Sequence, residues 1–186
     1  MVVTVGADDA TLASAMRSDE FNALFASLVT EPLAGVGFER WGKSLWFAGG
    51  GLRAAVLRTE QRNAWPFHLT LVVGHDCLRD FDDRLPAPRS RNVSEWPVKW
   101  QPSQSAQLGT ERWRYTPWNL GSYPYDAVAD DSAEEQLRAI ASTILQVAPE
   151  LPVSVSAEQV LERLRDQPQL AWCERRWIED YERHLG

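Results

Sequence analysis

The sequence predicts an α+β fold, in which helices pack on one face of a mainly antiparallel sheet of about four or five strands. Three observations support this prediction. Residues 18–33 have helical periodicity, short strand-like runs follow between 38 and 74, and helical periodicity returns from about 132 to 185. Strands and helices therefore do not alternate as βαβ units would require. Because no repeat or linker divides the chain, we expect residues 18–186 to form a single domain after a flexible N-terminus of residues 1–17.

The composition limits the possible functions. A chain of 186 residues is long enough to bury roughly 70% of the surface that its unfolded form exposes, so it needs no metal or disulfide to fold. The 26 acidic and 19 basic residues give a net charge of −7, which disfavours non-specific binding to nucleic acid. Cys77 and Cys173 lie far apart and outside any metal-ligand spacing, and the first residues resemble neither a signal peptide nor a membrane span. We therefore expect a cytoplasmic protein without a cofactor.

The first predicted elements are a helix and a hairpin. Apolar residues recur at helical spacing until Gly35 and Gly37 end the helix. The runs 38–47 and 52–59 then read as two strands joined by a turn at three consecutive glycines. These glycines precede no helix and no Gly-Lys-Ser/Thr motif, so a turn explains them better than a phosphate-binding loop. The apolar positions of the helix are Phe21, Leu24, Phe25, Leu28, Val29 and Leu33.

Further strands and three helices complete the fold. The run 66–74 alternates and predicts a third strand, buried on one face. Residues 76–107 are rich in Asp, Arg, Pro and Ser and predict a long loop, and 111–116 predicts a fourth strand. Ser132 with Glu135, and Ser156 with Gln159, have capping-box spacing at the starts of two helices, and a final helix is expected from about 168 to 184.

The N-terminal two thirds resemble a known bacterial family. FNALF is followed by EPLAGVGF at Glu31–Phe38, by Gln61 within TEQRN, by FHLTLVVG at Phe67–Gly74, and by QLGTERWRY at Gln107–Tyr115. This order is similar to the family catalogued as domain of unknown function 4304, in which a helix ending in Pro-x-Leu-x-x-x-Gly-Phe leads into successive strands. The resemblance covers residues 18–120 and leaves the C-terminal helices, about 132–185, unmatched. It implies a fold and no catalytic residues.

Candidate catalytic groups gather near the end of the third strand. His75, Asp76 and Cys77 include the side chains of a thiol nucleophile system, but catalytic Cys and His normally come from distant segments. The three histidines do not converge, so we expect no metal site. A solvated loop explains the carboxylates of residues 80–83 without catalysis. We therefore assign no catalytic residue, and the alternative is a cleft formed by His75, Cys77, Asp80 and Asp82.

Tryptophans are the other unusual feature. Trp41 and Trp46 have opposite parity, so in a regular strand they cannot both face the core, and one ring is expected to be exposed or to lie under another element. Trp113 and Tyr115 alternate with arginines and are expected in the core. The tryptophans of the predicted loop either pin it to the core or form a binding surface. The candidate partner-binding residues are Trp96, Trp100, Trp118, Arg89 and Arg91.

Two classes of function follow from these features. The first is a non-catalytic protein-binding module that uses the loop between Asp76 and Trp118, for example an immunity or antitoxin-like protein whose acidity attracts a basic toxin. The second is a small hydrolase or ligand-binding enzyme with a cleft between the sheet and this loop. A structural or oligomeric module is a third possibility.

Overall fold

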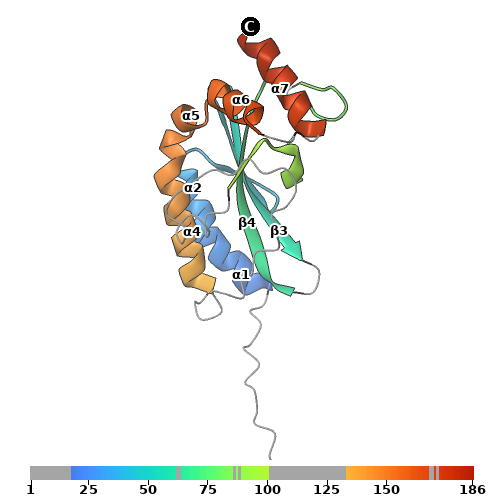
Figure 1. Cartoon of the computed structure of the whole chain (residues 1–186). Helices are drawn as coiled ribbons and strands as arrows, with labels where there is room; N and C mark the ends of the chain where they lie inside the picture. The colour runs from blue at the N-terminus through green and yellow to red at the C-terminus, as the bar shows by residue number, and fades with distance from the viewer. Residues whose placement is uncertain are drawn as a thin grey trace, which may run out of the picture.

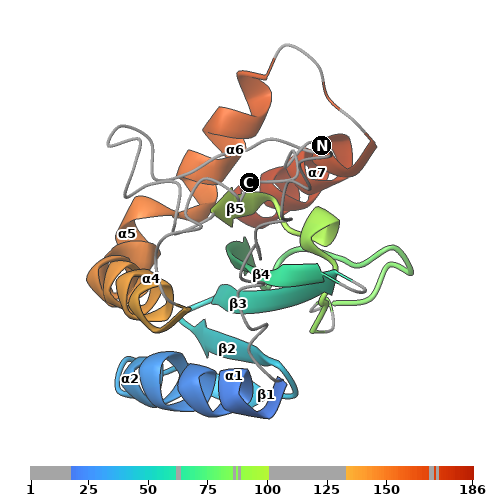
Figure 2. The same ribbon diagram turned by 90° about the horizontal axis from the view of Figure 1, so that it is seen from below.

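The computed structural model describes residues 18–61, 64–85, 87, 89–100, 133–167, 170 and 172–186. Within these residues an antiparallel sheet of five strands runs in the order β1-β2-β3-β4-β5, so each strand pairs with the next along the chain (Figure 2). The predicted α+β class with an antiparallel sheet is confirmed. The strands are β1 (Glu39–Trp41), β2 (Ser44–Gly49), β3 (Leu52–Gln61), β4 (Ala64–His75) and β5 (Val98–Trp100).

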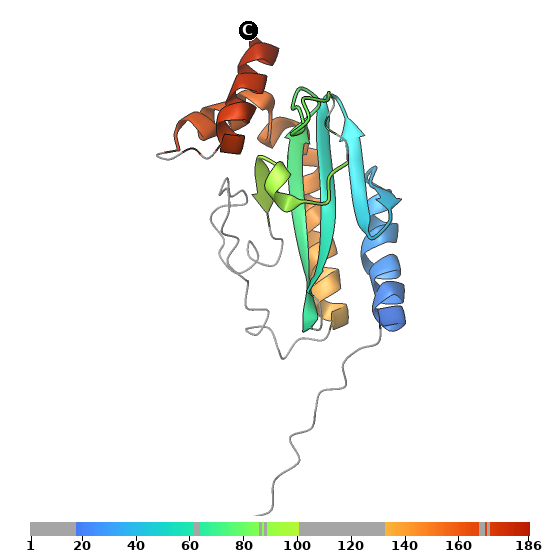
Figure 3. The same ribbon diagram turned by 90° about the vertical axis from the view of Figure 1, so that its right-hand side faces the viewer.

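Helices cover one face of this sheet and one of its ends. The helical segment from α1 to α2, residues 18–34, and α4 lie side by side against the sheet (Figure 1). Helices α6 and α7 lie beyond the end of the sheet where β4 finishes (Figures 1 and 3). The helical elements are α1 (Ser18–Phe25), η1 (Ala26–Thr30), α2 (Glu31–Ala34), α4 (Ala133–Val147), η4 (Ala148–Glu150), α5 (Leu151–Ser154), α6 (Ala157–Arg165) and α7 (Trp172–Leu185). None of the helices in the described ranges has both the length and the hydropathy needed to span a bilayer.

The first predicted helix contains a widened turn. Four residues of its apolar face are buried and Leu24 and Leu28 are half-buried, but η1 is π-helical. Pro32 has no N–H to donate to the carbonyl of Leu28, and the widened turn lies just before this proline. The hydroxyl of Thr30 donates to the carbonyl of Phe25 within this turn, at 3.4 Å. The predicted cap of α6 is confirmed, because the Ser156 hydroxyl accepts from the backbone N–H of Gln159 at 3.4 Å.

The predicted first strand, 38–47, was wrong in one respect. It is two short strands joined at Gly42 and Lys43, where Gly42 has a φ of +61°. Such a conformation favours glycine, and it reverses the chain so that Trp41 pairs with Ser44. Trp41 is 43% exposed and Trp46 is buried, but the reversal brings the two rings into contact, with centroids 5.6 Å apart, so the parity argument for a regular strand does not apply. The turn at Gly50 and Gly51 is also confirmed.

Two further expectations need correction. The predicted third strand, β4, is buried on both faces rather than one, since Thr70 and Val72 are as inaccessible as Leu71. The predicted loop also contains β5, which pairs with β4 and places Val98 opposite Val73. The strand predicted at 111–116, with Trp113 and Tyr115, lies outside the described residues.

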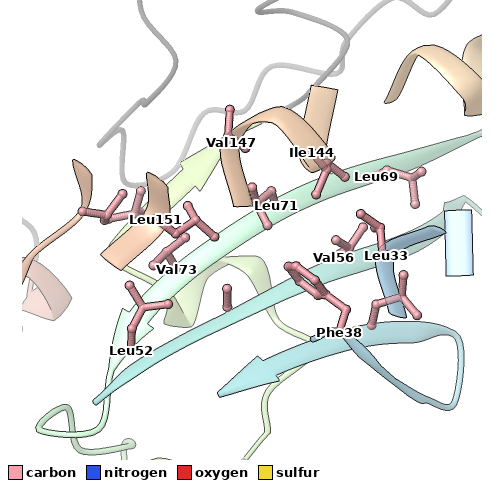
Figure 4. Packing of buried hydrophobic residues seen from close by; sticks show 14 of the residues in the cluster. Leu33, Phe38, Leu52, Val56, Leu69, Leu71, Val73, Ile144, Val147 and Leu151 are labelled. Atoms are coloured by element: carbon pink, nitrogen blue, oxygen red, sulfur yellow. The ribbon is translucent and has the colours of Figure 1, made fainter. Parts of the chain in front are cut away.

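The core consists of two clusters on opposite faces of the sheet. The larger cluster fills the space between the sheet and the helices, where Leu71 and Val73 of β4 meet Ile144 and Leu151 (Figure 4). Its size explains how the chain folds without disulfides, and both cysteines are free. The smaller cluster, on the other face, comprises Trp46, Ala55, Leu57, Val72 and Trp96.

Candidate functional site

A pocket lies at the end of the sheet, where β3 and β4, the segment before β5, and α7 meet. Its cavity of about 30 Å³ has room for roughly two water molecules. The sheet contributes Arg53, Gly74 and His75, the loop after β4 contributes residues 78–81, 87 and 90, the segment before β5 contributes Glu95, Trp96 and Pro97, and α7 contributes Cys173, Arg176 and Trp177.

Gly74 allows the sheet wall of this pocket to form. A Cβ atom on Gly74 would lie 3.3 Å from Cδ1 of Leu78 and 3.4 Å from Cε3 of Trp96. Without a side chain at residue 74, the ring of Trp96 packs directly against the strand. Trp96 is 5% exposed, its indole N–H donates to the carbonyl of Ser90 at 3.2 Å, and its ring meets that of Trp46 at 5.8 Å. Trp96 therefore pins the segment before β5 to the sheet and also lines the pocket.

A buried carboxylate joins the loop to α7. The fully buried side chain of Asp180 accepts from the backbone N–H of Arg79 at 3.0 Å and from Nε of Arg79 at 2.6 Å. It also accepts from the exposed guanidinium of Arg183 at 3.0 Å. The hydrogen bond to Asp180 raises the pKa of Arg79 above its ordinary value. This pairing, the Asp180 clamp, fixes the loop against the helix.

The loop is stabilised further by its own carboxylates. Asp80 accepts from the backbone N–H groups of Asp82 and Arg84 and from Nε of Arg84. Burial alone would raise the pKa of Asp80, but these hydrogen bonds outweigh it and hold the pKa below its ordinary value. Arg176 of α7 donates to the carbonyl of Asp80 at 2.7 Å and to the carboxylate of Asp83 at 2.6 Å. Asp80 therefore has a structural role in shaping the loop.

Arg53 differs from the other arginines of the pocket. Its side chain is 12% exposed, and it makes no hydrogen bond with the described residues. Its contact with the exposed carboxylate of Asp76 is long, at 3.6 Å, and its guanidinium lies 5.9 Å from the ring centroid of Trp96. Burial lowers the pKa of Arg53 and the charge of Arg89 lowers it further, while Asp76 acts in the opposite direction. The charge of Arg53 is thus poorly compensated within the described part of the chain.

Two exposed aromatic rings lie beside the pocket. Phe81, which lines it, is 50% exposed, and Trp172 at the start of α7 is 55% exposed. Their ring centroids are 5.2 Å apart, and the guanidinium of Arg176 lies 5.6 Å from the centroid of Trp172. We call this pair the aromatic rim. It places two large apolar groups in solvent directly next to a concave site.

A buried polar cluster lies behind the pocket. Lys99 of β5 is 3% exposed and lies 5.8 Å from the ring centroid of Trp177, while Glu174 is 1% exposed. The thiol of Cys173 donates to Oε2 of Glu174 at 3.3 Å, and Oε1 of Glu174 has no partner among the described residues. Burial lowers the pKa of Lys99, and burial followed by the bond to Glu174 raises the pKa of Cys173. The thiol is therefore protonated at neutral pH and a poor nucleophile.

The predicted catalytic alternative is only partly assembled. His75 and Asp80 line the pocket, but Cys77 and Asp82 are not among its lining residues. Nδ1 of His75 is bonded to the hydroxyl of Tyr181 at 2.8 Å, and burial lowers the pKa of the ring, although the Val155 backbone opposes this shift. Burial also raises the pKa of Cys77 to about 11. These groups have structural partners or unfavourable protonation states for catalysis.

Of the predicted partner-binding residues, the structure describes Trp96, Arg89 and Arg91 in full, and these three differ in exposure. Trp96 lines the pocket but is buried, as the core interpretation of this ring expected. Arg89 is exposed and lies over Trp41 and Trp46, at 5.9 and 5.7 Å from the ring centroids, and Arg91 is exposed. The ring of Trp100 and the whole of Trp118 lie outside the part that the structure describes.

The sequence analysis did not identify Phe81, Trp172 or Arg53 as site residues, although the sequence contains a signal for each of the two rings. Phe81 is an isolated aromatic residue within DFDDR, and Trp172 lies off the helical face defined by Cys173, Trp177 and Tyr181. Each pattern indicates an apolar side chain left in solvent. Nothing in the sequence indicates that the two rings meet.

No group of three or more His, Cys, Asp or Glu side chains in the described ranges is placed to hold a metal ion. Comparisons of the chain with protein-family models, with curated proteins and with solved structures found no match. The resemblance to the domain of unknown function 4304 family therefore stays a prediction.

Proposed function

We propose that this chain is a non-catalytic protein-binding module that binds its partner through the aromatic rim and the adjoining pocket. The observation that carries the proposal is the contact between Phe81 and Trp172, two rings that are each about half exposed. A ring of this size buries about 150–250 Å² when fully covered, and apolar surface contributes about 25 cal/mol per Å² when it leaves water. Covering both rings would therefore stabilise a complex substantially.

The residue types and the rigidity of the surface support the same function. Tryptophan and arginine are enriched among the residues that dominate protein interfaces, and Arg176 lies over the exposed Trp172. The loop that carries Phe81 is joined to α7 by the Asp180 clamp. A surface held in its binding conformation loses less conformational entropy when a partner binds.

An immunity or antitoxin-like role is the form of this function that the size and acidity of the chain favour. A net charge of −7 accelerates the encounter with a basic partner. The two free thiols suit a reducing, cytoplasmic location. The partner would place an apolar side chain against Phe81 and Trp172.

The alternative, a small hydrolase, has less support from the geometry. It requires a thiolate or an activated base in the pocket, whereas a pKa of about 11 keeps Cys77 protonated. His75 is bonded to Tyr181, and the carboxylate of Asp80 is bonded within its own loop. Each candidate group is thus explained by the packing around it.

Site-specific crosslinking tests the proposal. A photoreactive benzoyl-phenylalanine is placed at Phe81, at Trp172, or at Trp41, and each variant is irradiated in a lysate of the organism that encodes the chain. Trp41 is the matched control because it is a similarly exposed aromatic residue that does not line the pocket. We expect residues 81 and 172 to crosslink to the same protein and residue 41 to leave that protein unlabelled.

The affinity of the captured partner then tests the energetic claim. Trp172→Ala should weaken binding at least about tenfold, which is about 1.4 kcal/mol, while Trp41→Ala should leave it unchanged. Equal labelling from all three positions, or unchanged affinity in Trp172→Ala, would contradict the proposal. Circular dichroism confirms the folding of each variant.

A further inference from the structure

We propose that the pocket beside the aromatic rim binds a single carboxylate of the partner, with Arg53 as its principal ligand. This inference rests on the proposed function and names the partner chemistry at the same site. The acidic side chain that enters the pocket would fix the position of the partner, while the rim supplies the apolar contact.

The first argument is the state of Arg53. Its guanidinium is largely buried, forms no hydrogen bond with the described residues, and has a loose contact of 3.6 Å with Asp76. Arg89 is a second positive charge that acts on it. Burial of a charge that has one long ion pair and no hydrogen bond is costly. A carboxylate can supply two parallel hydrogen bonds to such a guanidinium, so a bound acidic group would remove this cost.

The second argument is the state of the remaining polar groups that line the pocket. Nε of Arg176 is buried and has no acceptor in the described ranges. The carboxylates of the lining already have partners: Asp80 is paired with Arg84, and Glu95 accepts from the amide of Asn92. The pocket therefore has a buried donor without an acceptor at Nε of Arg176, whereas its two carboxylates already have partners.

The size of the pocket selects the kind of anion. A cavity of about 30 Å³ accommodates about two water-sized atoms, which matches the two oxygens of a carboxylate. The ring of Trp96 forms one wall, and the exposed ring of Phe81 lines the same pocket, so an acidic residue next to an apolar residue would satisfy both parts of the surface.

The test uses small blocked amino acids as probes, so it does not require the partner. N-acetyl-glutamate α-amide and N-acetyl-glutamine amide are titrated into the isotope-labelled full chain. The NMR signals of Nε–Hε of Arg53 and of the indole N–H of Trp96 are followed, because both groups line the pocket. We expect saturable shifts with the glutamate probe and none with the glutamine probe.

Variants assign the binding to Arg53. Arg53→Gln should lower the affinity for the glutamate probe at least about tenfold. Arg53→Lys keeps the positive charge and loses the planar guanidinium, so it should lower this affinity less. Arg138→Gln is the matched control, because it removes one positive charge from the exposed face of α4, away from the pocket. It should leave the affinity unchanged. Arg53→Lys keeps the test valid if Arg53→Gln does not fold.

Three results would overturn the inference: shifts without saturation, equal binding by Arg53→Gln and the unaltered chain, or binding of inorganic phosphate about tenfold tighter than the glutamate probe. Failure of this inference and failure of the proposed function can be distinguished. Crosslinking at residues 81 and 172 does not depend on Arg53, and the probe titration does not depend on a partner.

Discussion

The Asp180 clamp gives the sharpest prediction about stability. In Asp180→Ala, the guanidinium and backbone N–H of Arg79 lose their acceptor at a fully buried position. Removing one partner of a buried pair costs about 3–5 kcal/mol. The side chain of Arg79 is 19% exposed and regains some hydration, so we expect the lower end, about 3 kcal/mol. For a chain of this size the melting temperature should fall by roughly 6–12 °C.

Urea unfolding followed by circular dichroism measures this change, and a double-mutant cycle assigns it. The cycle combines Asp180→Ala with Arg79→Ala, and their coupling energy should be at least about 1.5 kcal/mol. Arg183→Ala is the control, since Arg183 is 61% exposed and its ion pair with Asp180 should contribute less than about 1 kcal/mol. The reasoning would be refuted if Asp180→Ala cost less than about 1 kcal/mol, or if the two changes were additive.

Three further predictions concern titratable groups. Because the pKa of Cys77 rises from 9.0 to about 11, its thiolate population at about pH 8 should be about 100-fold smaller than that of an ordinary thiol. Iodoacetamide labelling resolved by mass spectrometry should therefore be slow until urea unfolds the chain, and fast labelling of the folded chain would contradict this. Burial lowers the pKa of His75 below 6.5, so the unfolded state takes up a proton first as the pH falls below 6.5. The free energy of unfolding should decrease there, and less so in His75→Gln; an equal decrease in both proteins would argue against burial of a neutral ring. Lys99 and Glu174 are both buried, and the charge of Glu174 acts on Lys99. Lys99→Met or Glu174→Leu alone removes one side of this interaction, so the double variant should unfold at a higher urea concentration than either single variant. If the double variant unfolded at a lower urea concentration than both single variants, the buried charges would be shown to stabilise the fold.

Local patterns predicted most of the fold because they depend on residues close in sequence. The helical spacing of Phe21, Phe25 and Val29 and the cap at Ser156 are confirmed because each reflects one face or one end of a single helix. β5 was missed because a strand of three residues has too little pattern of its own. It forms by pairing with β4, and such context outweighs intrinsic strand propensity.

The candidate site was harder to predict for the same physical reason. Phe81 lies in the loop after β4, Trp172 begins α7, and Arg53 comes from β3. Their proximity depends on tertiary packing, which spacing in the sequence does not encode. The sequence directed attention to the long loop after His75, and several residues of this loop line the pocket. Phe81 lies in the loop but was not among the predicted candidates. Trp96 has the aromatic character expected of a binding residue, yet its burial against Gly74 makes it part of the wall.

The clamp and the aromatic rim are physically linked, and this link connects stability to binding. Asp180 holds the loop that carries Phe81 against α7, which carries Trp172. If the loop were released, both rings would have to be ordered again on binding, at a cost of about 0.5–1.5 kcal/mol for each side chain. Asp180→Asn loses one of the two acceptor oxygens and keeps the other. Under conditions where this variant is folded, it should still bind the partner more weakly than the unaltered chain does. Trp41→Ala, which leaves the clamp intact, should not.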